Sequence, residues 1–556
     1  MKQSIVWLNS LENSNIQHAL NGGEIKICGA KVDGYDSETK TVYQYHGCFW
    51  HGCPSCYHEE SVNNVNKIPM GDLYEKTVKR TELLREAGFN VIEMWQCRFV
   101  KSKMYKNYKN SVNFEEPLNP RDAYFGGRTE VFKLKATSNS SHKIKYVDVC
   151  SLYPTVMYSD ECPSGHPVKI IRPTKYDEKW FGIIKCTVLP PKKLYVPVLP
   201  FKIKTTKSEK LLFPLCRKCA ETQTGIKNCE HSEIERQLLG TWSTVEVKKA
   251  LEKGYKILDI AEVWHFQKTT SKLFKKYIND FMKLKLESSP HNYPSNQAYA
   301  DDIKLRQGIE LDMQNIKPNP VKRTTAKTCM NSLYGRFGMR TNQTHTEFVT
   351  DPSRFYELLL DDRLDDLSIF YLTDDMIQVN YRYKDYFIEN RYNVNIFVAL
   401  YTTANARLRL YEELDRLGTA ACYCDTDSII YLDDGSNSVK TGDLLGDWTD
   451  ELGKNVHIEK FIATGPKSYY YITNQGKVVT KVKGFTLNHK NAQKINGEIL
   501  EKMVDREIQQ VKIEENRIFR DTTTKQLVNK NTTKTLSFNF DKRNIDENYD
   551  TLPFGF

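Results

Sequence analysis

Two aspartates, Asp425 and Asp427, stand one residue apart in a stretch that is otherwise mainly apolar. Residues two apart on an extended segment point to the same side, so the two carboxylates would concentrate negative charge there. A hard divalent cation such as Mg²⁺ would offset this charge, because it prefers oxygen ligands and accepts phosphate as a further ligand. An ordinary turn uses the same residue types, since Asp and Ser are common turn formers. The pair by itself fits both interpretations.

A third carboxylate, Asp148, lies near the end of a predicted strand, Ile144 to Val149, and shortly before Leu152-Tyr153-Pro154. A two-metal phosphoryl-transfer site holds its ions about 3.5–4 Å apart. Asp425 and Asp427 alone would leave such a site one carboxylate short, and Asp148 would supply it. The alternative is an Asp that caps the turn after its strand.

A basic segment from Val321 to His345 contains five Lys or Arg residues and no acidic residue. Asn319-Pro320 before it predicts a helix start, a cap followed by a first-turn proline, with the helix running to about Phe337. A basic helical face beside a metal site would hold a triphosphate, whose charge the cations neutralise; a solvated basic face is the alternative. One face of this helix would present Arg323, Lys327, Asn331 and Tyr334.

The elements that must position these residues follow from periodicity. Residues 420–432 predict two short apolar strands around the aspartate pair, and residues 269–288 predict an amphipathic helix with lysines outside its apolar face. In the helix after Pro320, the apolar stripe is Ala326, Met330, Leu333 and Phe337.

The order of these motifs resembles motifs A, B and C of the family B DNA polymerases. The matching residues are Asp148 before Ser151-Leu152-Tyr153-Pro154, then Lys327-xxx-Asn331-Ser332-x-Tyr334-Gly335, then Tyr423-x-Asp425-Thr426-Asp427-Ser428. Tyr124-Phe125-Gly126-Gly127-Arg128 is similar to the Tyr-x-Gly-Gly motif that follows the template strand, and Lys467-Ser468-Tyr469 to the Lys-x-Tyr motif at the primer terminus. The resemblance runs from about residue 120 to 556. Two sequence segments, Tyr401 to Arg409 and Asp550 to Phe556, are typical of the protein-primed, Polinton/Maverick-like branch.

The resemblance implies a role for each matched residue. Asp148 and Asp427, with the Val149 carbonyl, would ligate two Mg²⁺ ions, and Asp425 would sit beside them as the third catalytic carboxylate. Tyr153 would floor the sugar pocket and exclude a ribose 2′-hydroxyl. Lys327, supported by Arg323, would bind the incoming deoxynucleoside triphosphate, and Asn331 and Tyr334 would frame the nascent base pair. The residues expected to contact template or primer DNA are Tyr124, Gly126, Gly127, Arg128, Lys467 and Tyr469.

The fold that the resemblance implies is α+β: a right-hand polymerase of palm, fingers and thumb after a small Cys/His-rich α/β domain. The expected divisions are residues 1–20 as the remnant of a segment following an exonuclease, 21–110 as the Cys/His-rich domain, 120–265 as the first palm part with an insertion, 266–340 as fingers, 341–370 as a second insertion, 371–454 as the second palm part and 455–556 as thumb. A terminal protein as primer is a further partner that the protein-primed branch implies.

One cysteine cluster, Cys216, Cys219, Cys229 and His231, offers four soft or imidazole ligands. Four is the number that a closed, structural zinc site uses, and we favour zinc here over a reduced cluster without metal.

The first hundred residues resemble the very-short-patch mismatch endonucleases. The resemblance implies nuclease roles for Asp33, His46 and His51, and zinc ligands at Cys48, Cys53, Cys56 and Cys97. The further acidic residue expected upstream has no counterpart, so we favour a structural zinc domain over an active nuclease.

The bulk composition sets the remaining bounds. The net charge of +10 suits a polyanionic partner, and the CxxC spacings indicate metal binding in a reducing, intracellular compartment that could be nucleus, cytoplasm or mitochondrion. No apolar stretch is long enough to span a bilayer. Residues 1–20 contain only Glu12 and no Asp-x-Glu exonuclease motif, so we expect a chain that is shortened at its start and does not proofread. The competing hypotheses are a reverse transcriptase or RNA polymerase, which would place two aspartates side by side, a non-catalytic nucleic-acid-binding remnant, and an endonuclease.

Overall fold

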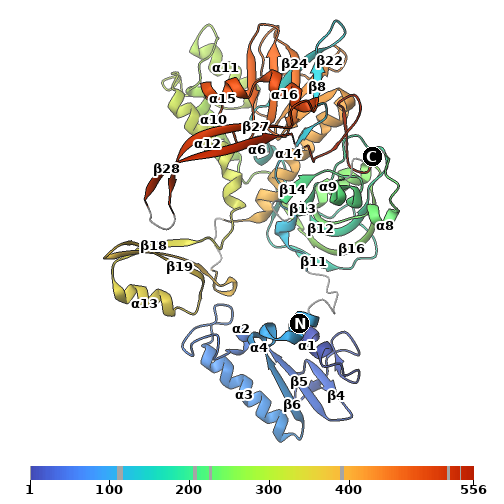
Figure 1. Ribbon diagram of the computed structural model, residues 1–556, viewed down its shortest axis with the longest axis vertical. Helices are drawn as coiled ribbons and strands as arrows, with labels where there is room; N and C mark the ends of the chain where they lie inside the picture. Colours follow the sequence, from blue (N-terminus) through green and yellow to red (C-terminus); the bar gives the residue numbers. More distant parts are fainter. Residues whose placement is uncertain are drawn as a thin grey trace. The chain divides into compact units, whose positions relative to one another are not determined.

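The computed structural model describes residues 2–108, 117–204, 209–223, 228–388, 394–521, 526–538 and 540–556. The chain forms two compact units, each built from two pieces of sequence. Unit 1 comprises Met1–Glu116 and Arg340–Tyr392, and unit 2 comprises Pro117–Met339 and Asn393–Phe556. Both units mix helices and strands, as the expected α+β class requires (Figure 1).

The N-terminal part of unit 1 is a sheet in the order β1-β4-β5-β6 with helices around it. Its strands are β1 (Gln17–His18), β4 (Gly34–Asp36), β5 (Thr41–His46) and β6 (Asn90–Trp95). β5 and β6 are parallel and are connected through α3 (Met70–Glu86). The other described elements are α1 (Lys2–Ser10), β2 (Lys26–Ile27), β3 (Ala30–Lys31), α2 (Cys48–His51), α4 (Gln96–Lys101) and α5 (Lys103–Tyr108).

The second part of unit 1 is a small sheet in the order β18-β20-β19 with one helix. The elements are β18 (His345–Val349), α13 (Pro352–Leu360), β19 (Leu364–Thr373), β20 (Met376–Tyr383) and the 3-10 turn η2 (Asp385–Phe387). Phe49 stacks on Tyr386 with ring centroids 4.4 Å apart, and His58 N donates to Asp362 at 2.7 Å. These contacts join residues 340–392 to the Cys/His-rich part; the predicted insertion limits of 341–370 stay a prediction.

The central feature of unit 2 is a sheet of nine described strands. Seven strands follow the order β26-β25-β24-β9-β22-β21-β7, while β23 pairs with β9 and β8 pairs with β24. Helix α14 (Ile396–Leu417) packs Leu410 and Leu414 into the core shared with Ile429, and α16 (Gly497–Val504) packs Leu500 into the core shared with Ile430. Since neighbouring strand residues point to opposite faces, the two helices cover opposite faces. The strands are β7 (Thr129–Val131), β8 (Lys135–Thr137), β9 (Lys143–Val149), β21 (Ala421–Asp425), β22 (Ser428–Asp433), β23 (Trp448–Asp450), β24 (Ile458–Gly465), β25 (Ser468–Thr473) and β26 (Val478–Lys481).

A second sheet in unit 2 has the order β11-β16-β12-β15. It lies in the region expected to hold the first insertion. Its strands are β11 (Val168–Ile171), β12 (Gly182–Leu189), β15 (Leu238–Ser243) and β16 (Lys256–His265). Beside it lie β13 (Phe201–Lys204), β14 (Glu209–Leu212), α7 (Arg217–Thr222), α8 (Glu233–Arg236) and α9 (Thr244–Glu252).

Helix α12 (Pro320–Phe337) carries most of the predicted basic segment, and α10 (Lys275–Glu287) and α11 (Asn296–Gln307) precede it. The predicted start of α12 is confirmed, because the Asn319 side chain accepts from Lys322 N and Pro320 fills the first turn. The helix expected over 269–288 begins later, since β17 (Lys268–Thr270) pairs with β10 (Cys162–Ser164). Helix α6 (Leu152–Ser159) follows β9 directly.

The remaining described elements are η1 (Pro120–Ala123), η3 (Gly418–Ala420), α15 (His489–Lys494), β27 (Gln510–Arg520), β28 (Leu527–Ser537), β29 (Asn544–Ile545) and β30 (Thr551–Leu552). Among the described residues, no helix combines the length and apolar character needed to cross a membrane.

Candidate active site and metal centres

The aspartate pair lies at the turn of a β-hairpin. Asp425 ends β21, Ser428 begins β22 and the two are register partners, with Asp427 N donating to Asp425 O at 2.6 Å. Thr426 adopts a positive φ of 62°, so a tight turn, rather than one extended segment, brings the carboxylates together. This corrects the sequence-based reason for their closeness.

Strand β9 joins Asp148 to this hairpin. It pairs with β22 so that Asp148 faces Ser428, and Val149 N donates to Asp427 O at 2.7 Å. The three predicted carboxylates therefore lie together where β9 and β21 end and β22 begins. The predicted metal-ligand carbonyl of Val149 lies in the same segment.

Two of the three carboxyl groups have raised pKa values. Burial, followed by the charge on Asp427, raises the pKa of Asp148 to about 7. Burial, followed by the charge on Asp425, raises the pKa of Asp427 to about 6. A bound cation would relieve the repulsion among these neighbouring negative charges, so this oxygen donor set fits a divalent metal such as Mg²⁺.

A fourth acid, Glu451, also raises the pKa of Asp148 through its negative charge. Its backbone N donates to Tyr146 O on β9 at 3.0 Å, which fixes it directly after β23. Sequence reasoning missed Glu451, because only the pairing of β23 with β9 brings it to the site.

Asp425 differs from its neighbours because a cation already binds it. Lys467 Nζ lies 2.9 Å from each of its carboxylate oxygens, and Thr129 Oγ1 donates to it at 3.0 Å. The Lys467 backbone N donates to the phenol oxygen of Tyr423 at 3.0 Å. Tyr469, the second predicted primer contact, is buried beside Tyr423 with ring centroids 5.2 Å apart.

The predicted cations of α12 meet a further lysine from α10. Burial lowers the pKa of Lys285, and the nearby positive charges of Arg323 and Lys327 act in the same direction. Lys285 Nζ lies 3.9 Å from Cys150 Sγ, two residues after Asp148. The sequence signal for Lys285 was weak, since α10 carries several lysines and only packing against α12 and α6 singles out this one.

Two tyrosines that the resemblance assigns to the nucleotide pocket lie together. The rings of Tyr153 and Tyr334 have centroids 4.2 Å apart, at an angle of 37°. Asn331 lies one helical turn before Tyr334, and its Oδ1 is buried without a hydrogen-bond partner among the described residues.

The Tyr-x-Gly-Gly segment packs against the turn that carries Asp425 and Asp427. Thr426 N donates to Arg128 O at 2.7 Å, and a Cβ on Gly127 would lie 2.6 Å from Thr426 Oγ1. The Arg128 side chain is buried and donates to Glu130 at 2.7 Å, whereas Gly126 O accepts from Arg407 at 2.9 Å. A DNA-contact role for Tyr124, Gly126, Gly127 and Arg128 stays a prediction.

Unit 2 brings together the four predicted ligands of its Cys/His cluster. The ligand atoms of Cys216, Cys219, Cys229 and His231 lie within 4.8 Å of one another. Three thiols and one imidazole at this spacing fit a tetrahedral zinc ion.

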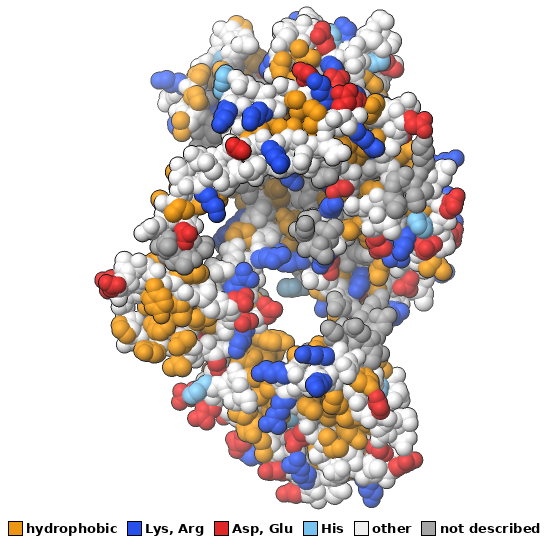
Figure 2. Space-filling view, in the orientation of Figure 1, with side chains coloured by type: hydrophobic (Ala, Val, Ile, Leu, Met, Phe, Trp, Pro, Cys, Tyr) orange, Lys and Arg blue, Asp and Glu red, His pale blue; other side chains and the backbone are white. Residues whose placement is uncertain are grey.

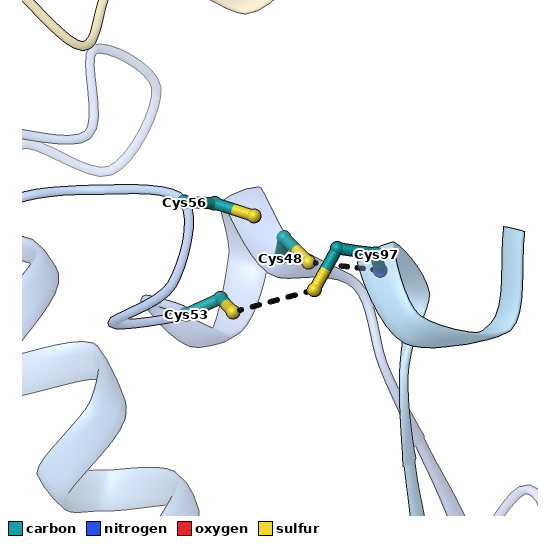
Figure 3. Close-up of side chains that lie close together, drawn as sticks. All are labelled: Cys48, Cys53, Cys56 and Cys97. Atoms are coloured by element: carbon teal, nitrogen blue, oxygen red, sulfur yellow. Dashed lines mark hydrogen bonds between the residues drawn. The ribbon is translucent and has the colours of Figure 1, made fainter. Parts of the chain in front are cut away.

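Unit 1 likewise gathers Cys48, Cys53, Cys56 and Cys97 within 4.8 Å (Figure 3). Cys97 reaches the cluster from the start of α4, with its Sγ 3.8 Å from Cys53 Sγ. Four thiols without an open ligand position fit a structural zinc site, as predicted.

The residues with predicted nuclease roles lie near this cluster. Asp33 accepts from Tyr45 N at 2.9 Å, and the rings of His46 and His51 have centroids 4.9 Å apart. Burial lowers the pKa of His46 and, with the charge of His46, lowers the pKa of His51 to about 4. Glu93, which sequence reasoning missed, lies 3.0 Å from His46 Nε2 because β6 pairs with β5.

Comparison with known proteins identifies a family. The family model described as "DNA polymerase type B, organellar and viral" matches residues 97–305 and 310–417, more than half of the chain. The match includes Asp148 and Lys327 and ends before the hairpin that carries Asp425 and Asp427.

Two curated relatives share the name "Probable DNA polymerase". The one from Neurospora intermedia is 24% identical over 408 residues, covering 70% of this chain and 34% of the relative. The one from Ascobolus immersus is 27% identical over 220 residues, covering 39% of this chain and 14% of the relative. The chain thus spans about a third or less of the length of these relatives.

Solved structures of Phi29 DNA polymerase also match. The orthorhombic crystal form gives a TM-score of 0.49 at 18% identity, covering 76% of this chain and 62% of that one. The complex with primer-template DNA and incoming nucleotides gives 0.47, at the same identity and coverage.

Proposed function

The chain belongs to the organellar and viral type B DNA polymerases, and we propose that it is a DNA-directed DNA polymerase whose reaction centre is built on Asp148 and Asp427. The observation that carries the proposal is the junction of β9 and β22. It sets two carboxyls with raised pKa values against each other, with the positive charge of Lys327 acting on both. Phosphoryl transfer needs this combination of metal-binding acids and triphosphate-binding cations.

The reaction is the attack of a primer 3′-hydroxyl on the α-phosphate of a deoxynucleoside triphosphate, with pyrophosphate leaving. Lys285, Lys327 and Arg323 would bind the triphosphate and stabilise the charge that leaves with pyrophosphate. Tyr153, packed on Tyr334, would exclude a ribose 2′-hydroxyl. Asn331 would orient the nascent base pair through its unpartnered buried oxygen.

Two Mg²⁺ ions, held by Asp148, Asp427 and the Val149 carbonyl, would supply electrostatic stabilisation of the attacking and leaving oxygens. Asp425 would hold Lys467 near the primer terminus. Thr129, through its hydrogen bond to Asp425, would keep that carboxylate oriented.

We assign palm, fingers and thumb by the same proposal. The nine-stranded sheet would be the palm, α10–α12 the fingers, and the region from α15 through β28 part of the thumb. This assignment departs from the predicted divisions, because the sheet runs past residue 454 to β26 and residues 371–392 belong to unit 1. Priming by a terminal-protein hydroxyl, in place of a nucleic-acid primer, is the finer part of the proposal, and it rests on the sequence phrases shared with protein-primed polymerases.

Primer extension by the full chain tests the proposal. With Mg²⁺ and a primed template, we expect Asp427→Asn to abolish nucleotide addition and to leave DNA binding within about twofold, since the change keeps the side-chain shape. The matched control is Asp434→Asn, on the loop after β22, which should keep full activity. Equal extension by Asp427→Asn and the unchanged chain would disprove the site assignment.

A second candidate function concerns unit 1, where Asp33 and His51 line a cavity of about 590 Å³. Lys31 and Arg80 line the same cavity and would bind a phosphodiester. The buried Nδ1 of His46 has no hydrogen-bond partner in the described part of the chain, while Glu93 fixes its Nε2. His46 lines a second cavity that shares His51 and Arg80 with the first. These features support DNA cleavage at the two cavities.

The cleavage test uses the full chain with Asp427→Asn, so that synthesis does not interfere. Duplex DNA and a divalent metal are added, and Asp33→Asn is compared with Asp36→Asn, a neighbouring acid whose carboxylate is held by Asn13. Nicking that disappears with Asp33→Asn but not with Asp36→Asn would support the proposal. If the Asp427→Asn chain itself does not nick DNA, the structural zinc site would be the remaining proposed role of unit 1.

A further inference from the structure

The segment from Thr551 to Phe556 runs directly over the Cys/His cluster of unit 2. Leu215 N, next to the ligand Cys216, donates to Phe554 O at 2.7 Å. The Phe554 side chain is buried in a small apolar cluster whose other buried members are Ile203, Leu212, Cys216, Cys219 and Ala220. Two metal ligands thus form part of the wall that holds Phe554.

Gly555 shows how close this approach is. It has a positive φ of 89°, and a Cβ there would lie 2.3 Å from Cys216 Cβ and 2.6 Å from Cys216 N. No larger residue fits between the segment and the ligand without displacing one of them. The position of Cys216 and the position of this segment are therefore mutually dependent.

The other end of the segment lies on the catalytic sheet. Thr551 is fully buried; its N donates to Phe132 O at 2.8 Å and its Oγ1 to Val131 O at 2.7 Å. Val131 ends β7, the edge strand that pairs with β21 and places Thr129 opposite Asp425. Next to Thr551, Asp550 binds Lys133 Nζ at 2.8 Å.

Arg543 fixes the same segment from inside the unit. Its Nε donates to Thr551 Oγ1 at 3.0 Å and its Nη2 to Thr551 O at 3.1 Å. A continuous set of contacts thus runs from Cys216 through Phe554 and Thr551 to β7 and the catalytic hairpin.

We propose that a zinc ion at Cys216, Cys219, Cys229 and His231 holds the Thr551–Phe556 segment against β7, and that the ion thereby stabilises the edge of the catalytic sheet. Helix α7, which carries Cys219, has six residues and is too short to be stable by itself. Metal binding is the interaction strong enough to order it, because ligand binding and local folding are linked. The ion is structural, since all four ligand positions are filled by protein.

This proposal is independent of polymerase activity, and amide hydrogen exchange with zinc analysis tests it on the full chain. The unchanged protein should contain two zinc ions, one in each cluster. Cys229→Ser should lose one ion and increase exchange of peptides covering 129–134 and 546–556 by about tenfold or more. Cys97→Ser is the matched control, because it should lose the other ion and leave both peptides protected.

The reciprocal variant keeps all ligands and removes the contact. In a Cys97→Ser background, Phe554→Ala should weaken zinc binding at the unit 2 cluster about tenfold, since coupling between two sites acts equally in both directions. Leu527→Ala, at an exposed position on β28, should bind zinc as before.

Three results would overturn the proposal. One is the loss of zinc by Cys229→Ser with unchanged exchange of both peptides. Another is unchanged zinc affinity in Phe554→Ala. A third is an unchanged protein that takes up no zinc at the unit 2 cluster.

Discussion

Lys467 contacts both carboxylate oxygens of Asp425 at 2.9 Å, and this ion pair separates the roles of two aspartates that stand one residue apart. Lys467 forms an ion pair with Asp425, whereas the pKa of Asp427 rises to about 6 through burial and the negative charge of Asp425. Asp427 has no such ion pair, so a bound metal ion would stabilise its charged form more than that of Asp425.

The ion pair predicts a primer-related defect for Lys467→Met. The ammonium of Lys467 is half exposed beside Asp425. We expect it to lie near the primer terminus, so its loss should raise the KM for primed template about tenfold or more and change the KM for nucleotide little. Lys460→Met, which removes an ion pair between β24 and Glu501 on α16, is the control and should stay within about twofold. Steady-state primer extension measures both constants, and equal constants for the two variants would contradict the assigned role.

The raised pKa of Asp148 predicts that replacing this residue stabilises the protein and abolishes its activity. Its pKa in the folded protein lies near 7, above its ordinary value, so the folded state binds the proton more tightly than the unfolded state. The ionised carboxylate therefore lowers the stability of the metal-free protein as pH rises from about 4 to 7. Asp148→Asn should raise the free energy of unfolding at pH 8 by about 1–2 kcal/mol, a value reduced for solvent screening.

Thermal unfolding with a chelator present measures this effect. The gain for Asp148→Asn should shrink as pH falls toward 5, while nucleotide addition is lost at every pH. Asp302→Asn is the control with the opposite sign, since hydrogen bonding to Arg306 and Tyr293 lowers the pKa of Asp302. A destabilised Asp148→Asn protein at pH 8 would show that the carboxylate is not repelled by its neighbours.

Much of this site could be predicted from sequence, because its key elements have local signals. The hairpin around Asp425 and Asp427, the strand before Asp148 and the capped helix after Asn319 all follow from residue spacing and capping. Each cysteine cluster contains one CxxC pair, which marks it in the sequence, whereas Cys48 and Cys97 were predicted only through the resemblance to the very-short-patch endonucleases.

The missed residues depend on long-range packing. Glu451 reaches Asp148 only through the pairing of β23 with β9, and Glu93 reaches His46 only because β6 lies beside β5. Lys285 is one of several lysines on its helix, and only the packing of α10 on α12 distinguishes it. A turn at the aspartate pair was one of the two interpretations left open, but the positive φ of Thr426 has no simple sequence signal at a non-glycine residue.

Lys285 predicts a nucleotide-binding defect. Lys285→Met keeps the apolar stem but removes the charge beside Arg323 and Lys327, so the KM for deoxynucleotide should rise about tenfold or more. Lys283→Met, two residues earlier on α10, removes a surface charge paired with Glu287 and should change this KM by less than about twofold. The comparison requires nucleotide titrations at saturating primed template. Matching KM values for the two variants would remove Lys285 from the triphosphate site.

Gly127 predicts a steric defect at the aspartate turn. A methyl group on Gly127 would lie 2.6 Å from Thr426 Oγ1 and 2.8 Å from Thr426 Cγ2, so Gly127→Ala must displace the turn that carries Asp427. We expect a loss of about 1–3 kcal/mol in stability from overpacking, and a loss of about a hundredfold in nucleotide addition from misplaced carboxylates. Gly126→Ala is the control for stability, because a Cβ there would meet no atom within 4 Å.

A second substitution separates this steric effect from a loss of backbone freedom. Thr426→Gly removes the clashing side chain and suits the positive φ of 62° at that position. The double variant Gly127→Ala/Thr426→Gly should therefore recover most of the stability and activity that Gly127→Ala loses. Thermal unfolding and primer extension of the four proteins form a double-mutant cycle. Additive losses would mean that Gly127 and Thr426 act independently, and the close approach would then not explain why this position is a glycine.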